Sequence, residues 1–238
     1  MEVQDLEQIV RQREGALSTA FPALMRKVYV WMALALVITG ICAFGTASSP
    51  HLMTALYSSR AAIWILLIAE IGLVFYTTAR IDKLSLSTAT TLFIIYSALN
   101  GVTLSSIFLV YTMTSITQVF FITAGTFGAM AFYGYVTKTN LAKIGNILFM
   151  ALIGIIIASV VNMFLRSSGF DLILSYIGVL LFVGLTAWDS QRIKQALAMQ
   201  PDMSEASQKI ALLGALELYL DFINLFLYLL RIFGKSDN

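Results

Sequence analysis

Residues 210–233 read IALLGALELYLDFINLFLYLLRIF, an apolar run that contains two acids, Glu217 and Asp221. At about 1.5 Å of rise per residue, a helix of this length crosses a hydrocarbon layer of about 30 Å. A carboxylate at that depth costs on the order of several kcal/mol unless a partner or water accompanies it. The run is therefore predicted to span a membrane, and Asp221 is its strongest functional candidate.

The polar residues of this run share one helical stripe. They are separated by steps of three and four residues, while Leu, Phe and Ile fill most of the other positions. A stripe with two acids is tolerated at membrane depth only where it faces protein or water. We therefore predict that this helix is central or lines a cavity through its stripe residues, which are Gly214, Glu217, Asp221, Asn224 and Tyr228.

The composition extends this interpretation to the whole chain. Its 238 residues are 59% hydrophobic and 12% charged, with a mean hydropathy of +0.85. A soluble domain of this composition would expose apolar patches that aggregate. Backbone groups in hydrocarbon must bond within their own segment, so the fold is predicted to be an all-α integral membrane protein. Seven transmembrane helices are predicted, at Val28–Ala47, Ala61–Ala79, Leu86–Val110, Ile116–Val136, Ile144–Leu165, Leu172–Trp188 and Ile210–Phe233.

Short breaks between the spans indicate one bundle, with a longer polar connection at 190–209. We predict a single seven-helix membrane domain over 28–234, a polar N-terminal tail over 1–27 and a short C-terminal tail over 235–238. The first 27 residues lack the order of elements of a signal peptide. They are interpreted as a partly disordered cytoplasmic tail, with an amphipathic surface helix as the alternative.

The distribution of Lys and Arg predicts the orientation. With seven spans, eleven of the 15 basic residues lie on the side of the N-terminus, which is therefore predicted to be cytoplasmic. The C-terminus is then outside, although an even number of spans would place both termini inside. The basic residues are too evenly spread for nucleic-acid binding, so none is expected as a partner. The expected surroundings are a lipid bilayer.

Further charges lie within or beside other spans. In this orientation Asp189 and Arg80 share a level near the cytoplasmic face, and Glu70 lies ten residues deeper than Arg80. Asp221 is similarly deep. Together with Glu217 these residues would form an acid-rich track from the cytoplasmic rim toward the middle of the membrane.

Neighbouring carboxyl groups favour proton sensing, because they bind protons as a coupled unit. Their hard oxygen ligands also suit Ca²⁺ better than zinc or copper. An Arg within reach of one acid would hold a helix end closed until that acid is protonated. The alternative for Asp189 is an ordinary carboxylate at a helix end in the wet interface. A single cysteine, Cys42, and a single histidine, His51, argue against a disulfide and a transition-metal site.

Small residues at helical spacing predict close helix contacts in three spans. The expected contact residues are Ser97, Gly101 and Ser105 in the third span, Ala124 and Gly128 in the fourth, and Gly154, Ala158 and Asn162 in the fifth.

Two motifs carry a resemblance to a known family. Residues 184–191 read GLTAWDSQ at the end of the sixth span, and residues 218–226 read LYLDFINLF in the seventh, followed by LLR at 229–231. This pattern, with YSALNG at 96–101 and YGY at 133–135, resembles the transmembrane Bax inhibitor motif family. It is closest to that family's bacterial inner-membrane members, so residence in the inner membrane is expected.

The resemblance implies a pH-sensitive calcium leak channel, with passive Ca²⁺ flux and a seventh helix wrapped by the other six. Asp189 and Asp221 match the family's proton-sensing aspartate pair and are candidate Ca²⁺ ligands, and Arg80 matches an arginine that latches the first of them. Glu217, Glu70 and Asn224 are expected as secondary residues of the ion pathway. No catalytic residue or cofactor is expected beyond Ca²⁺ and protons. The chain departs from the family at Trp188, where Tyr is usual, and in its long 190–209 connection.

The sequence also suggests two alternatives to the channel. Paired aspartates on two spans also describe intramembrane aspartyl proteases, but those enzymes have a Gly-rich turn where this chain has the bulky residues 218–220. A regulatory protein that binds another membrane protein, as a protease modulator or an inhibitor of cell death, stays open. Such a protein is expected to bind its partner through the N-terminal tail.

Overall fold

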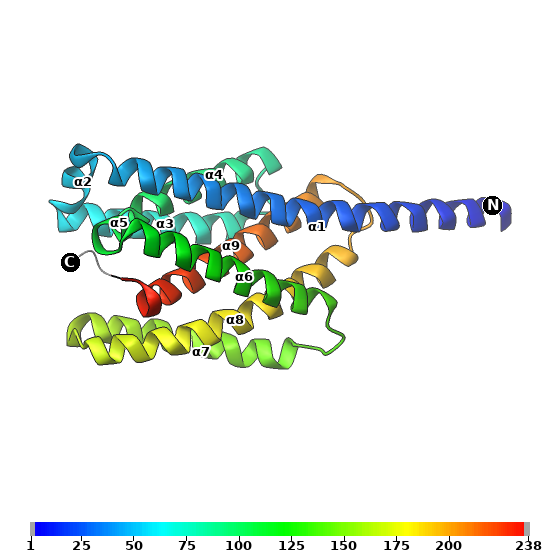
Figure 1. The fold of residues 1–238 in the computed structure, drawn as a ribbon. Coiled ribbons are helices and arrows are strands. Elements are labelled where there is room, and N and C mark those ends of the chain that lie inside the picture. Colours follow the sequence, from blue (N-terminus) through cyan, green and yellow to red (C-terminus); the bar gives the residue numbers. More distant parts are fainter. Residues whose placement is uncertain (1–2, 236–238) are drawn as a thin grey trace. The chain divides into compact units, whose positions relative to one another are not determined.

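The computed structural model describes residues 3–235, with side chains from Ala20 onward except that of residue 60. The regular structure in this part of the chain is helical (Figure 1). The helices are α1 (Val3–Ala47), α2 (Pro50–Tyr57), α3 (Arg60–Arg80), α4 (Leu86–Leu104), α5 (Ile107–Val110), α6 (Met113–Val136), α7 (Ala142–Leu165), α8 (Ser168–Ala198) and α9 (Glu205–Phe233).

Seven helical segments within 20–235 are long and apolar enough to cross a membrane. They are Ala20–Ala47, Ala61–Arg80, Leu86–Val110, Met113–Val136, Ala142–Leu165, Ser168–Ala198 and Glu205–Phe233. The prediction of an all-α membrane protein with seven spans is therefore confirmed. The segment on α9 is the most buried of the seven, because 67% of the residues in its most apolar window are buried. Its predicted place at the centre of the other six stays a prediction.

The predicted connection at 190–209 was wrong, because α8 continues as far as Ala198. Most residues of 191–198 are good helix formers, and Ile193 and Leu197 are both buried at a four-residue spacing. The hydropathy pattern placed the end of this span too early, because the helical turns after Trp188 are polar on their other faces. The true connection is the short segment 199–204.

The N-terminal tail has a helical backbone from Val3, where α1 begins. This is the conformation that the surface-helix alternative expected. The side chains of the tail before Ala20 lie outside the described residues, so its position on a membrane surface stays a prediction. Residues 236–238 of the predicted C-terminal tail also lie outside the described residues.

The contacts divide the chain into two units, and the first holds the described residues up to Leu104 together with 193–216. In this unit α1 and α3 both pack against α4. The Thr39 hydroxyl on α1 donates a hydrogen bond of 2.9 Å to the Ser97 carbonyl on α4. A Cβ at Gly101 would lie 2.4 Å from the Thr39 carbonyl oxygen, so only glycine permits this approach. The predicted contact role of Gly101 is confirmed.

The connection before α9 carries an exposed acid, Asp202. Its carboxylate accepts hydrogen bonds from the Ser204 backbone N–H at 2.9 Å and from the Ser207 hydroxyl at 3.3 Å. Hydrogen bonds from Ser204 favour the charged form and lower the pKa of Asp202 below its ordinary value. These bonds hold the turn that leads into α9.

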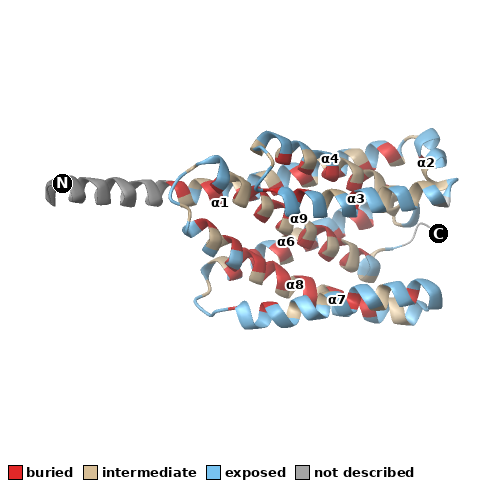
Figure 2. Ribbon diagram, turned by 180° about the vertical axis from the view of Figure 1, so that it is seen from behind, coloured by how far each residue is buried: buried red, intermediate tan, exposed pale blue. Residues whose placement is uncertain are grey.

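The second unit holds residues 105–192 and 217–235. Here α8 approaches α6 closely, because a Cβ at Gly134 would lie 2.0 Å from the Ala187 carbonyl oxygen. The Ser190 hydroxyl on α8 also donates to the Ala131 carbonyl on α6 at 2.7 Å. Buried residues recur along α8, whereas α7 is mostly exposed (Figure 2). The exposed apolar side chains of α7 fit a helix that faces lipid.

Candidate functional site

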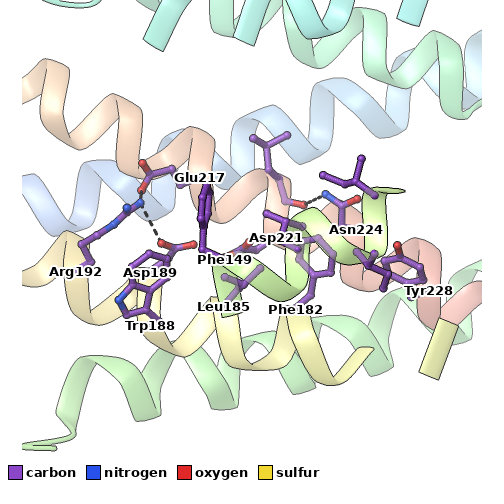
Figure 3. A pocket seen from close by; sticks show the side chains of 14 residues that line it. Phe149, Phe182, Leu185, Trp188, Asp189, Arg192, Glu217, Asp221, Asn224 and Tyr228 are labelled. Carbon is purple, nitrogen blue, oxygen red and sulfur yellow. Dashed lines mark hydrogen bonds and ion pairs between the residues drawn. The ribbon is translucent and has the colours of Figure 1, made fainter. Parts of the chain in front are cut away.

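A cavity of about 380 Å³ lies within the second unit, bounded by α7, α8 and α9 (Figure 3). Most of its walls are apolar, with a few polar groups that converge from α8 and α9. The lining residues are Phe149, Leu152, Ile155 and Ile156 from α7, Phe182, Leu185, Trp188, Asp189 and Arg192 from α8, and Glu217, Leu220, Asp221, Asn224 and Tyr228 from α9.

The polar stripe of α9 faces this cavity. Glu217, Asp221, Asn224 and Tyr228 all line it, which confirms the predicted orientation of the helix for these four residues. Gly214 belongs to the other unit, where it lies against Ile193. The Asn224 side chain donates a hydrogen bond of 2.8 Å to the Leu220 carbonyl in its own helix. Its amide nitrogen is thereby fixed to the backbone.

Asp189 and Asp221 reach the cavity from different helices, α8 and α9. Both are buried, with exposed fractions of 7% and 5%. Their carboxyl groups are near enough for a hydrogen bond between them, which requires a proton on one of the two. The Oδ2 atom of Asp221 is buried without a hydrogen-bond partner. The structure thus brings together the two acids that the sequence paired, while their role as a sensor stays a prediction.

A cation that the sequence interpretation missed lies beside this pair. Nη2 of Arg192 is 3.0 Å from Oδ1 of Asp189 and 2.6 Å from Oε2 of Glu217. Figure 3 shows the guanidinium between the two acids. The contact with Asp189 is an ion pair without hydrogen-bond alignment. The guanidinium also lies over the Trp188 ring, with 4.7 Å from Cζ to the ring centroid.

The residues between Asp189 and Arg192 anchor α8 to its surroundings. Ser190 bonds to α6, as described above. The buried Gln191 side chain accepts the Leu141 N–H at 2.9 Å and donates to the Thr139 carbonyl at 2.8 Å, which ties down the connection between α6 and α7. The DSQR sequence at 189–192 therefore combines two cavity residues with two residues that fix their helix.

A family model described as "Inhibitor of apoptosis-promoting Bax1" matches residues 22–238. The chain belongs to the Bax inhibitor family. It is 49% identical to "Inner membrane protein YbhL" of Escherichia coli strain K12, over 96% of both chains. It is also 46% identical to an uncharacterized protein of Borreliella burgdorferi, over 90% of this chain and 92% of that one. An uncharacterized protein of Deinococcus radiodurans is 37% identical over 99% of this chain. The predicted family is confirmed, and these relatives are bacterial, as the resemblance implied.

The other residues transferred from the Bax inhibitor family lie in the first unit. Arg80 is exposed and is the last residue of α3, so its predicted latch on Asp189 stays a prediction. Glu70 is buried in α3, where its carboxylate accepts a hydrogen bond from the Thr103 hydroxyl. It does not line the cavity described above, and its part in an ion pathway is likewise a prediction.

The donor chemistry of the cavity suits a hard cation. Its acids offer carboxylate oxygens, the ligands that Ca²⁺ prefers, and one of these oxygens has no partner in the protein. Among the described residues, no group of three or more His, Cys, Asp and Glu is arranged to hold a metal ion.

Proposed function

We propose that this Bax inhibitor family protein is a pH-sensitive calcium leak channel of the inner membrane. The observation that carries the proposal is the buried carboxyl of Asp221, with one unpartnered oxygen, beside that of Asp189 in a cavity between spans. Uncompensated acids at such depth are costly and are typical of ion and proton pathways. Flux is passive, and the proposal includes no catalytic residue.

The proton sensor is the aspartate pair. With both carboxyl groups ionised, their repulsion favours a divalent cation near them, whereas a bound proton bridges them and removes that charge. Arg192 and Glu217 are the charged groups that share the cavity with the pair. Protonation weakens the hold of an arginine on Asp189, and the second span then moves away from the seventh to open a polar path. Arg80 is the proposed latch for that movement.

The direct test is Ca²⁺ flux into liposomes that contain the purified protein and a trapped Ca²⁺ dye, measured across a pH series. We expect flux that rises on acidification. Asp221→Asn removes the proton-binding group at similar size, so the ratio of flux at low and high pH should fall toward one. Asp202→Asn is the matched control, because it neutralises an exposed acid outside the cavity. Flux in Asp221→Asn with the same pH dependence as the unaltered protein would contradict the sensor.

A regulatory function is the second candidate, because the matching family model is described as an inhibitor of Bax1. In this alternative the protein binds another membrane protein through its N-terminal tail. Deletion of residues 1–20 separates the two functions. Unchanged ion flux with loss of a partner's response supports regulation, and loss of flux with an unchanged partner supports conduction.

A further inference from the structure

Arg192 occupies the more exposed end of the cavity. Its side chain is 46% exposed and that of its partner Glu217 is 37% exposed, whereas the Asp189 side chain is only 9% exposed. Asp221 is buried as well. The ion bridge therefore stands between the surroundings and the buried aspartate pair.

One guanidinium nitrogen contacts both acids of this bridge. Nη2 approaches Oδ1 of Asp189 and Oε2 of Glu217 from a single position, as a small cation between two carboxylates would. Among the described residues, the cavity is lined by three acids, Asp189, Glu217 and Asp221, and by one basic residue, Arg192. One positive charge cannot neutralise three carboxylates, so the site retains an attraction for a further cation when they are ionised.

The Trp188 side chain packs against Arg192 and supports its position. The guanidinium lies over the Trp188 ring, and that ring fills space left by Gly145 on α7. Trp188 thus limits the directions in which the arginine can leave its two acids. At the position where this chain departs from the usual Tyr of its family, the larger ring provides the surface for the arginine.

We propose that Arg192 is a tethered cation that competes with Ca²⁺ for Asp189 and Glu217. An incoming divalent cation must displace the guanidinium before these carboxylates can coordinate it. Because half-exposed ion pairs are weak, the bridge opens readily and the competition sets affinity without blocking entry. Arg192 therefore weakens cation binding at the mouth of the cavity and favours release over retention. This inference rests on the proposed calcium leak and assigns it a residue that determines affinity.

The test compares Arg192→Gln, Arg192→Lys and a matched control, Lys194→Gln, which removes the same charge two residues further along α8. If the bridge is closed in about nine molecules of ten, its loss tightens apparent affinity about tenfold. We expect Arg192→Gln to lower the half-saturating Ca²⁺ concentration for liposome flux by about that factor. Arg192→Lys should give a smaller change and Lys194→Gln none. Equal half-saturation in Arg192→Gln and the unaltered protein overturns the inference while the leak stands.

Binding of Mn²⁺ to the purified full-length protein, followed by electron paramagnetic resonance, makes the inference independent of flux. If no variant conducts Ca²⁺ but Arg192→Gln binds Mn²⁺ about tenfold more tightly, the proposed leak fails and the competition holds. If the unaltered protein conducts but Mn²⁺ affinity is the same with and without Arg192, the competition fails alone. If neither the unaltered protein nor any variant conducts Ca²⁺ and Mn²⁺ affinity is the same with and without Arg192, both proposals are rejected.

A chemical rescue controls for misfolding of the variants. Cys42 is the only cysteine of the chain, so Arg192→Cys in a Cys42→Ser background offers one thiol for modification. A methanethiosulfonate reagent with a cationic end should restore the weaker Ca²⁺ affinity, whereas a neutral reagent of similar size should not. Equal effects of both reagents would show that bulk, and not charge, acts at this position and would overturn the inference.

Discussion

Gly145 on α7 provides the space that the Trp188 ring on α8 fills. A Cβ at residue 145 would lie 2.1 Å from Cε2 of this ring, far inside van der Waals contact. The same ring supports Arg192, which bridges Asp189 and Glu217. A glycine on one helix thus positions a charged group on another through an aromatic side chain.

Gly145→Ala is therefore expected to displace Trp188 and loosen the Arg192 bridge. Overpacking of this kind costs about 1–3 kcal/mol of stability. The emission of Trp188 should shift in a protein that also carries Trp31→Phe and Trp64→Phe, and half-saturation of flux should change with it. Gly154→Ala on the same helix is the control, because a Cβ there meets nothing within 4 Å. Identical spectra for both alanine variants would show that Gly145 does not position the ring.

Gln191→Ala tests the anchoring of α8 to the connection between α6 and α7. The substitution leaves the buried Leu141 N–H without its acceptor and the Thr139 carbonyl without its donor. We expect a loss of about 1–3 kcal/mol in the free energy of unfolding, measured by thermal denaturation in detergent. Gln200→Ala is a suitable comparison, since the Gln200 side chain makes half-buried hydrogen bonds, to the Ala196 carbonyl on α8 and from the Ser207 hydroxyl on α9. Equal losses in both variants would reject a special role for Gln191.

The sequence predicted the spans and the facing of α9 because both follow from local spacing. Seven apolar runs and a stripe repeated every three or four residues need no knowledge of neighbouring helices. Arg192 was missed because hydropathy ended the sixth span at Trp188, which placed the arginine in a loop. In the structure α8 continues, so Arg192 lies one turn from Asp189 on the same helix. A hydropathy window detects only the apolar part of a helix, so it does not show that the helix continues beyond the membrane.

Predictions of helix contacts from small residues were also only partly correct. Gly101 makes the predicted tight contact, whereas a Cβ at Gly128 or Gly154 would meet nothing within 4 Å. The close approaches at Gly134 and Gly145 were not predicted. Spacing identifies a face of small residues, but the rotation of each helix in the assembled unit decides which face meets a neighbour.

Ser204→Ala should raise the pKa of Asp202 toward its ordinary value, because the serine hydroxyl no longer stabilises the carboxylate. A group whose pKa is lower in the folded state stabilises the fold above its unfolded pKa, and that contribution is lost as pH falls through the folded pKa. The turn before α9 should therefore loosen on acidification in the unaltered protein. Nuclear magnetic resonance titration of Asp202 in both proteins measures the shift, and equal pKa values would refute the assignment.

Asp221→Leu separates function from stability at the centre of the site. The buried Oδ2 of Asp221 has no partner, and an unpaired polar group in apolar surroundings costs about 1–3 kcal/mol. Leucine branches at the same atom as aspartate, and it removes that cost together with repulsion from Asp189 and Glu217. We expect a higher thermal midpoint in detergent and a loss of Ca²⁺ flux, the trade-off typical of a residue retained for activity. A lower midpoint in this variant would mean that Asp221 serves the fold.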